Sequence, residues 1–95
     1  MNSMMKTYVV EPREHTSVEF DPIMLHGSIT EACLTVRSYE GEAHLTAQHV
    51  CKAVIAWLAG RTEVTRRDIR RVATNALTVY HPEAAYLYEN ERNII

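Results

Sequence analysis

The stretch TRRDIRRVATNALTVY, residues 65–80, decides the fold that we predict for this chain. Its apolar residues recur at the spacing of an amphipathic helix and fill an arc of roughly 140°. They are Ile69, Val72, Ala73, Ala76, Leu77 and Tyr80. Thr65 precedes them as a plausible N-cap, and Asp68 follows in the first turn, where the helix dipole favours an acid. We therefore predict a core-facing helix.

Arginines crowd the first half of this helix. Between residues 61 and 71, five arginines face two acids. Arg66 and Arg70 fall on the edge of the apolar arc, where the helix would meet its neighbours. The opposite sides carry Arg67, Arg71, Asn75 and Thr78. Two arginines four residues apart near a helix N-terminus can bind one phosphate group. They can equally cover core residues and pair with acids such as Glu63 or Glu14.

Length and composition describe a single domain. The chain has 95 residues, of which 46% are hydrophobic and 23% charged, and a net charge of −2. This balance argues against a bulk nucleic-acid binder.

Cys33 and Cys51 lie in predicted helices without a CxxC spacing, so we expect buried free thiols and no metal site. The start lacks the apolar core of a signal peptide, and we expect a soluble cytoplasmic protein with no membrane partner.

The remaining segments predict a hairpin followed by helices. Residues 1–5 are expected to be a flexible terminus, residues 6–20 a hairpin with strands at 6–10 and 18–20, and residues 21–92 the helical part. The predicted helices start at Asp21-Pro22, Thr46, Thr65 and Pro82, and they end near Arg37, Gly60, His81 and Arg92. The predicted fold is α+β, with a small N-terminal β-hairpin packed on a bundle of four helices in one domain, residues 1–95.

The sequence holds no recognisable catalytic motif. The five histidines show no HExxH spacing, and the three glycines form no nucleophile elbow or phosphate loop. We therefore expect no enzyme. Glu40 and Glu42 flank Gly41 in what we predict to be a solvated loop. His26 lies beside the apolar stripe of the first helix, and we expect a boundary histidine there.

The order of these segments resembles the ATP-cone domain. The residues that carry the resemblance are Phe20-Asp21, Ala32-Cys33, the stretch from Val64 to Leu77, and the closing pattern Ala-Tyr-x-Tyr-x-x-x-Arg, within a match from about Lys6 to Arg92. ATP-cones are the N-terminal nucleotide-sensing domains of ribonucleotide reductase large subunits, and they also occur in the zinc-ribbon repressor of reductase genes. The resemblance implies a non-enzymatic regulatory domain with ATP or dATP as its ligand.

The chain departs from the family where the family binds phosphate. The family hairpin reads Val-x-Lys-Arg-Asp-Gly, and its lysine and arginine contact the nucleotide. Here Glu11 replaces that lysine, and Arg13 is the basic group that remains. A second family lysine, four residues into the first helix, is Met24 here. The resemblance therefore implies a nucleotide or phosphate site made of Arg13, Arg66 and Arg70, with two cations fewer than usual.

Three functions remain open at this point. The first is an allosteric sensor that binds a nucleotide or a smaller phosphate ligand. The second is a cone that has lost its ligand and serves in protein association or dimerisation, through the acidic last helix or the methionine-rich start. The third is a nucleic-acid contact through the arginine-rich helix, whose sequence is also similar to helical lids of AAA-type ATPases and to histone-like folds. No aromatic residues interleave with the arginines for base stacking, so the third is the weakest.

Overall fold

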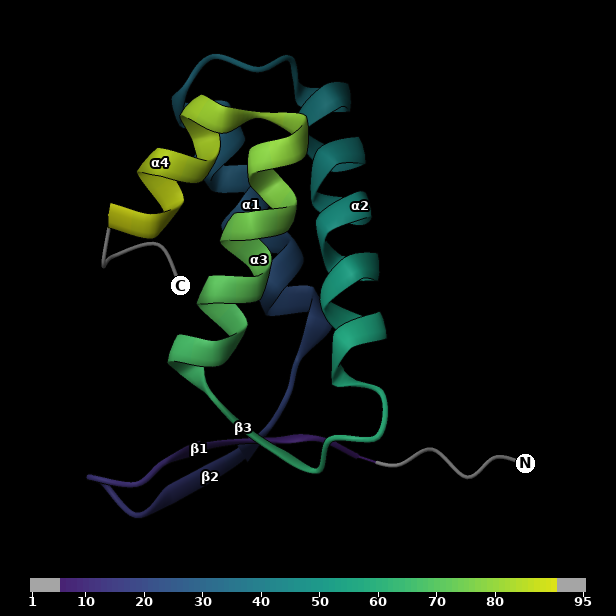
Figure 1. Ribbon diagram of the computed structural model, residues 1–95. Coiled ribbons are helices and arrows are strands. Elements are labelled where there is room, and N and C mark those ends of the chain that lie inside the picture. Colours follow the sequence, from purple (N-terminus) through teal and green to yellow (C-terminus); the bar gives the residue numbers. More distant parts are fainter. Residues whose placement is uncertain (1–5, 91–95) are drawn as a thin grey trace.

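The computed structural model describes residues 6–90 of the chain. Within them, four helices stand on a three-stranded sheet that lies across one end of the bundle (Figure 1). The elements are β1 (Tyr8–Glu11), β2 (Thr16–Glu19), α1 (Pro22–Thr35), α2 (Glu40–Leu58), β3 (Glu63–Thr65), α3 (Arg66–Tyr80) and α4 (Pro82–Asn90). The predicted α+β fold, with its hairpin and four helices, is confirmed. The predicted terminus 1–5 and the predicted helix end near Arg92 lie outside the described residues.

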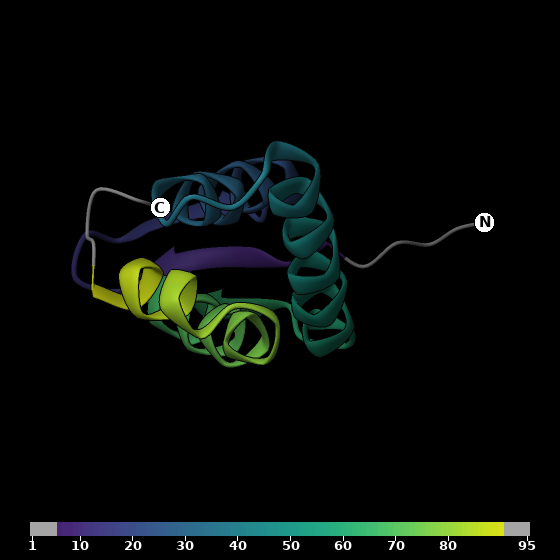
Figure 2. The same ribbon diagram turned by 90° about the horizontal axis from the view of Figure 1, so that it is seen from above.

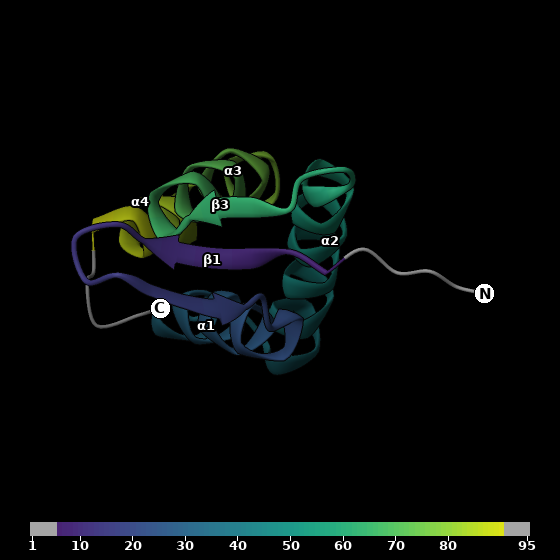
Figure 3. The ribbon, with the colours of Figure 1, turned by 90° about the horizontal axis from the view of Figure 1, so that it is seen from below.

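The central strand of the sheet is β1 (Figure 3). It pairs antiparallel with β2, placing Val9 opposite Val18, and parallel with β3, placing Val9 opposite Val64. Val9 and Val64 are both buried and belong to the hydrophobic core. The hairpin was predicted, whereas β3 was not. Three residues are too few to show a strand's alternation, and the partner of β3 lies far away in the sequence.

The helices form a ring around one core. Viewed from above, α2 stands beside α1 and α3, and α4 closes the ring between α3 and α1 (Figure 2). The largest fully buried side chains are Ile29, Cys33, Val50, Val54 and Leu77, which come from three of the four helices. Burial of each such aliphatic side chain contributes about 1.5–3 kcal/mol to stability.

Side chains cap α1 and α3 where the sequence predicts. Asp21 accepts a 2.9 Å hydrogen bond from the amide of Ile23 at the start of α1. Thr65 and Asp68 form a reciprocal capping box at the start of α3, because each side chain accepts from the other residue's amide at 3.1 Å. These caps satisfy amides that have no partner inside the helix. They also fix the direction in which α3 leaves the sheet.

The start of α2 corrects the sequence prediction. The helix begins at Glu40 and not at Thr46, so Glu40 and Glu42 are in its first turn and not in a loop. Tyr39 is the N-cap and makes no side-chain cap hydrogen bond, so no capping signal marks this start in the sequence. The extra turn is favoured because Ala43 is fully buried and because the two acids complement the helix dipole.

Tyr80, which the apolar arc predicts to face the core, is less buried than predicted. Tyr80 is 52% exposed and stacks on His49 of α2, with ring centroids 4.9 Å apart. Trp57 packs against the core but is only partly buried, and the Arg61 guanidinium lies 4.2 Å from its ring centre.

No helix in residues 6–90 combines the length and the apolar character that a membrane crossing needs.

Candidate functional site

An open groove of about 510 Å³ separates the sheet from the N-terminal half of α3. Its walls come from β1, β2, the start of α1, α3 and the end of α4. The apolar and aromatic residues that line it are Val9, Val18, Phe20, Met24, Leu25, Ile69 and Tyr88. Its charged residues are Glu19, Asp21, Arg66, Arg67, Arg70 and Glu89. The groove therefore combines an apolar surface with three guanidinium groups from one helix.

Arg66 lies at the edge of the groove nearest the sheet. Its Nε is 3.5 Å from Oε2 of Glu11 on β1, and the two side chains are 58% and 31% exposed. An ion pair as exposed as this contributes about 0–1 kcal/mol to stability. An incoming anion could therefore replace Glu11 at small cost. The partner predicted from the sequence was Glu63 or Glu14, and the structure places Glu11 there.

Arg70 is held in place by α4. Its Nη1 donates a 2.6 Å hydrogen bond to the backbone carbonyl of Tyr88, and its guanidinium carbon lies 4.9 Å from the centre of the Tyr88 ring. Burial raises the pKa of the Tyr88 phenol, an effect that the charge of Arg70 partly opposes. Arg70 thus has a fixed position in the groove wall.

Arg67 is the groove residue that the sequence analysis missed. The helical wheel places it on the side of α3 away from the core, yet it lines the groove beside Arg66 and Arg70. Within residues 6–90, no hydrogen bond or ion pair engages its guanidinium. Arg67 also lines a second hollow of about 160 Å³ with Arg71 and Asn75. An arginine without a partner between two hollows is well placed to accept an anion.

The other predicted phosphate contact lies elsewhere. Arg13 is an exposed residue of the turn between β1 and β2, and it is not among the residues that line the groove. The structure thus brings Arg66 and Arg70 together but does not bring Arg13 to them. Met24, which replaces a family lysine, lines the groove with an apolar side chain.

The groove carries balanced charge. Its three arginines are matched by three acids, Glu19, Asp21 and Glu89. Asp21 is engaged in capping α1, and Glu19 lies 4.0 Å from Lys6. A ligand with one or two negative charges and a flat apolar part would fit this lining better than a naked polyanion.

The described residues, 6–90, contain no cluster of three metal-ligating side chains, since no three His, Cys, Asp or Glu side chains come together in a way that could hold a metal ion. Comparison with protein-family models, with curated proteins and with solved structures finds no match to this chain.

Proposed function

We propose that the groove between the sheet and α3 binds a small phosphorylated ligand of the nucleotide class, and that the chain is a non-enzymatic sensing domain. One observation carries the proposal: Arg66, Arg67 and Arg70 line an apolar groove of about 510 Å³. This volume is within the roughly 300–1,000 Å³ that small-molecule sites occupy. The apolar and aromatic surface suits a base, and the arginines suit the phosphate.

The three arginines would act in different ways. Arg67 offers an unengaged guanidinium, which can make two parallel hydrogen bonds to a phosphate. Arg66 would exchange its exposed pair with Glu11 for the ligand. Arg70 would keep its bond to the Tyr88 carbonyl and contribute its positive charge from a fixed place in the groove wall. Repulsion from the groove acids would limit the phosphate charge that the site accepts.

The position of the groove suggests how binding could be sensed. The hairpin, α1, α3 and α4 all contribute lining residues, so a bound ligand would join elements from both halves of the chain. A ligand that binds only this arrangement stabilises it by mass action. The resemblance to ATP-cones adds ATP and dATP to the ligands to test, beside AMP, whose smaller charge suits the lining better. The two free cysteines, Cys33 and Cys51, suit a reducing compartment such as the cytoplasm.

Thermal unfolding with a ligand series tests the proposal. ATP, dATP, ADP, AMP, adenosine and inorganic triphosphate should each be titrated to millimolar concentration. Binding should raise the unfolding free energy by about 2.7 kcal/mol at a hundredfold excess over Kd. At least one nucleotide should raise the unfolding free energy more than adenosine or triphosphate does. The reason is that the groove offers an apolar surface to the base and arginines to the phosphate. Unchanged melting curves across the whole series would overturn the proposal.

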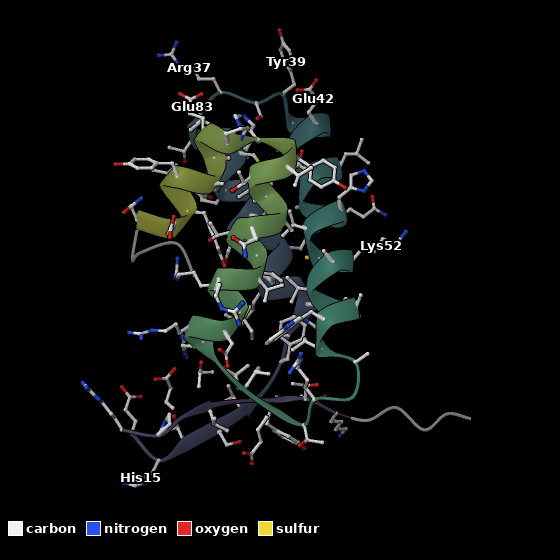
Figure 4. The ribbon with its side chains drawn as sticks, viewed as in Figure 1. His15, Arg37, Tyr39, Glu42, Lys52 and Glu83 are labelled. Carbon is white, nitrogen blue, oxygen red and sulfur yellow. The ribbon has the colours of Figure 1, made fainter. Side chains whose placement is uncertain are left out.

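Protein association is the second candidate function. Tyr39 and Val79 are 80% and 78% exposed. Both lie toward the end of the bundle that is opposite the sheet, where Figure 4 also places Arg37, Glu42 and Glu83. Contiguous exposed apolar patches rimmed by polar residues mark association sites, so this end of the bundle is the surface to test. Light scattering coupled to size exclusion would test self-association, and a strict monomer over a wide concentration range would exclude it. The methionine-rich start lies outside the described residues.

A further inference from the structure

Two histidines from neighbouring helices meet away from the groove. His26 of α1 and His44 of α2 bring Nε2 and Nδ1 within 3.2 Å of each other. Their rings lie within 20° of parallel, with centroids 5.5 Å apart. A centroid separation of 5.5 Å is the distance expected when two imidazole rings meet edge to edge through nitrogens 3.2 Å apart. The contact therefore joins two nitrogen atoms and not two ring faces. It satisfies His26, as the sequence analysis expected of a boundary histidine.

We propose that His26 and His44 form a two-histidine binding site for a divalent transition-metal ion. Imidazole nitrogen is a preferred ligand of Cu²⁺, Ni²⁺ and Zn²⁺ and a poor one for Mg²⁺. The site is independent of the groove, because neither histidine lines it. It would bridge α1 and α2, two helices that pack directly against each other.

The distance between the two nitrogens suits a metal ion. Zinc binds imidazole nitrogen at about 2.0–2.1 Å, so a tetrahedral centre holds two such nitrogens roughly 3.3 Å apart. The observed separation is 3.2 Å. The backbones of α1 and α2 therefore need not move. The rings need only tilt, so that their lone pairs converge on one point outside the line that now joins them.

The proton between the rings has a simple route away. In the neutral pair, one contact nitrogen carries the N–H and the other accepts it. For a metal to bind, that N–H must pass to the outer nitrogen of the same ring, by exchange with water. Each ring then presents a lone pair at the contact and keeps one proton on its outer nitrogen.

Solvent can reach the pair. His44 is exposed and His26 is half-buried, so water can complete the coordination sphere. Residues 6–90 offer no third His, Cys, Asp or Glu for such a centre. The site should therefore exchange its metal readily. Its affinity should follow the intrinsic order of the divalent metals for imidazole, with Cu²⁺ bound more tightly than Ni²⁺ or Zn²⁺.

Titration calorimetry on protein purified without a histidine tag tests the proposal. Cu²⁺, Ni²⁺ and Zn²⁺ should bind one per chain, with Cu²⁺ tightest, and Mg²⁺ should give no heat. His26→Gln and His44→Gln should each weaken binding on the order of a hundredfold, because losing one of two linked ligands removes the chelate gain. Two matched controls, His15→Asn and His49→Gln, should bind as the parent does. Asn tolerates the left-handed backbone of position 15, where φ is 55°.

A measurement on the unaltered protein covers the case in which a variant does not fold. Substoichiometric Cu²⁺ should broaden the amide signals around residues 26 and 44 before those around residues 15, 49 and 81. Broadening that begins elsewhere would overturn the proposal. Parent-like binding by the double variant His26→Gln/His44→Gln, or equal binding of Mg²⁺ and Zn²⁺, would overturn it too.

Discussion

Arg70 on α3 donates a 2.6 Å hydrogen bond to the backbone carbonyl of Tyr88 on α4, and its guanidinium also lies over the Tyr88 ring. The bond uses a carbonyl near the end of α4, where helical carbonyls lack intrahelical partners. Arg70 thus ties the last helix of the fold to the helix that carries the candidate site. Because Arg70 ties α4 to α3 and also lines the groove, its replacement should affect both stability and ligand binding.

Replacing Arg70 tests the tie to α4. Arg70→Ala should lower the unfolding free energy by about 1–2 kcal/mol, since a hydrogen bond from a charged donor is lost and the carbonyl keeps access only to water. Tyr88→Phe should keep the bond, because the acceptor is in the backbone. Urea unfolding measures both. Arg71→Ala, which removes an exposed pair with Asp68, should cost less than about 1 kcal/mol. An equal loss for Arg70 and Arg71 would contradict the assignment.

Arg67 should matter for the ligand and not for the fold. Arg67→Gln should weaken nucleotide binding roughly tenfold or more, because it removes a charged hydrogen-bond donor from the groove. Its unfolding free energy should change by less than about 0.5 kcal/mol, since the guanidinium has no partner in residues 6–90. Calorimetry and urea unfolding separate the two effects. Arg13→Gln is the matched control, and an equal loss of affinity there would move the binding site to the hairpin turn.

Glu11 should restrain ligand binding. Glu11→Gln releases Arg66 from its 3.5 Å ion pair and removes a negative charge beside the groove. Nucleotide affinity should therefore rise several-fold, while stability falls by no more than about 1 kcal/mol. Glu14→Gln removes the same charge from the hairpin turn without touching Arg66, so it controls for net charge. An affinity that is unchanged in Glu11→Gln would show that Arg66 does not contact the ligand.

The capping box of α3 predicts a pH dependence of stability. The backbone amide of Thr65 lowers the pKa of the Asp68 carboxyl below its ordinary value, with help from the Thr65 hydroxyl and Arg71. A carboxyl with a lower pKa in the folded state adds stability above its unfolded pKa and loses it as the pH falls through the folded one. Asp68→Asn should therefore be less stable than the parent at neutral pH, and the difference should shrink in acid.

Thr65→Ala should cost about 0.5–2 kcal/mol at neutral pH, which is typical of a lost N-cap. Thermal unfolding between pH 2 and pH 7 measures both variants. Thr46→Ala is the control, because Thr46 was predicted as a cap but lies inside α2. A larger cost at Thr46 than at Thr65 would contradict this assignment of the caps.

The sequence predicts most of the helices because their signals are local. In α3 the apolar spacing and the pair Thr65 and Asp68 sit within one segment, and the structure confirms both. The start of α2 was missed because Tyr39 makes no side-chain cap and Gly41 weakens the helical pattern. Strand β3 was missed because its partner β1 is distant in sequence.

The candidate site shows the same division between local and long-range information. Arg66 and Arg70 could be chosen from the helical wheel, since they flank the apolar arc. Arg67 could not, because the wall that brings it to a groove is built by the hairpin and α4. The pairing of Arg66 with Glu11 depends on the parallel contact between β1 and the segment before α3. No spacing within one segment encodes such a pairing.

The central place of β1 has a consequence for synthesis on the ribosome. Val9 emerges before its partner Val64, which follows only after α1 and α2 have been translated. Until then one edge of the hairpin has no neighbouring strand, and the groove lacks the residues that α3 and α4 contribute. Ligand capture should therefore follow the emergence of α3 and α4 from the exit tunnel and coincide with the completion of this sheet.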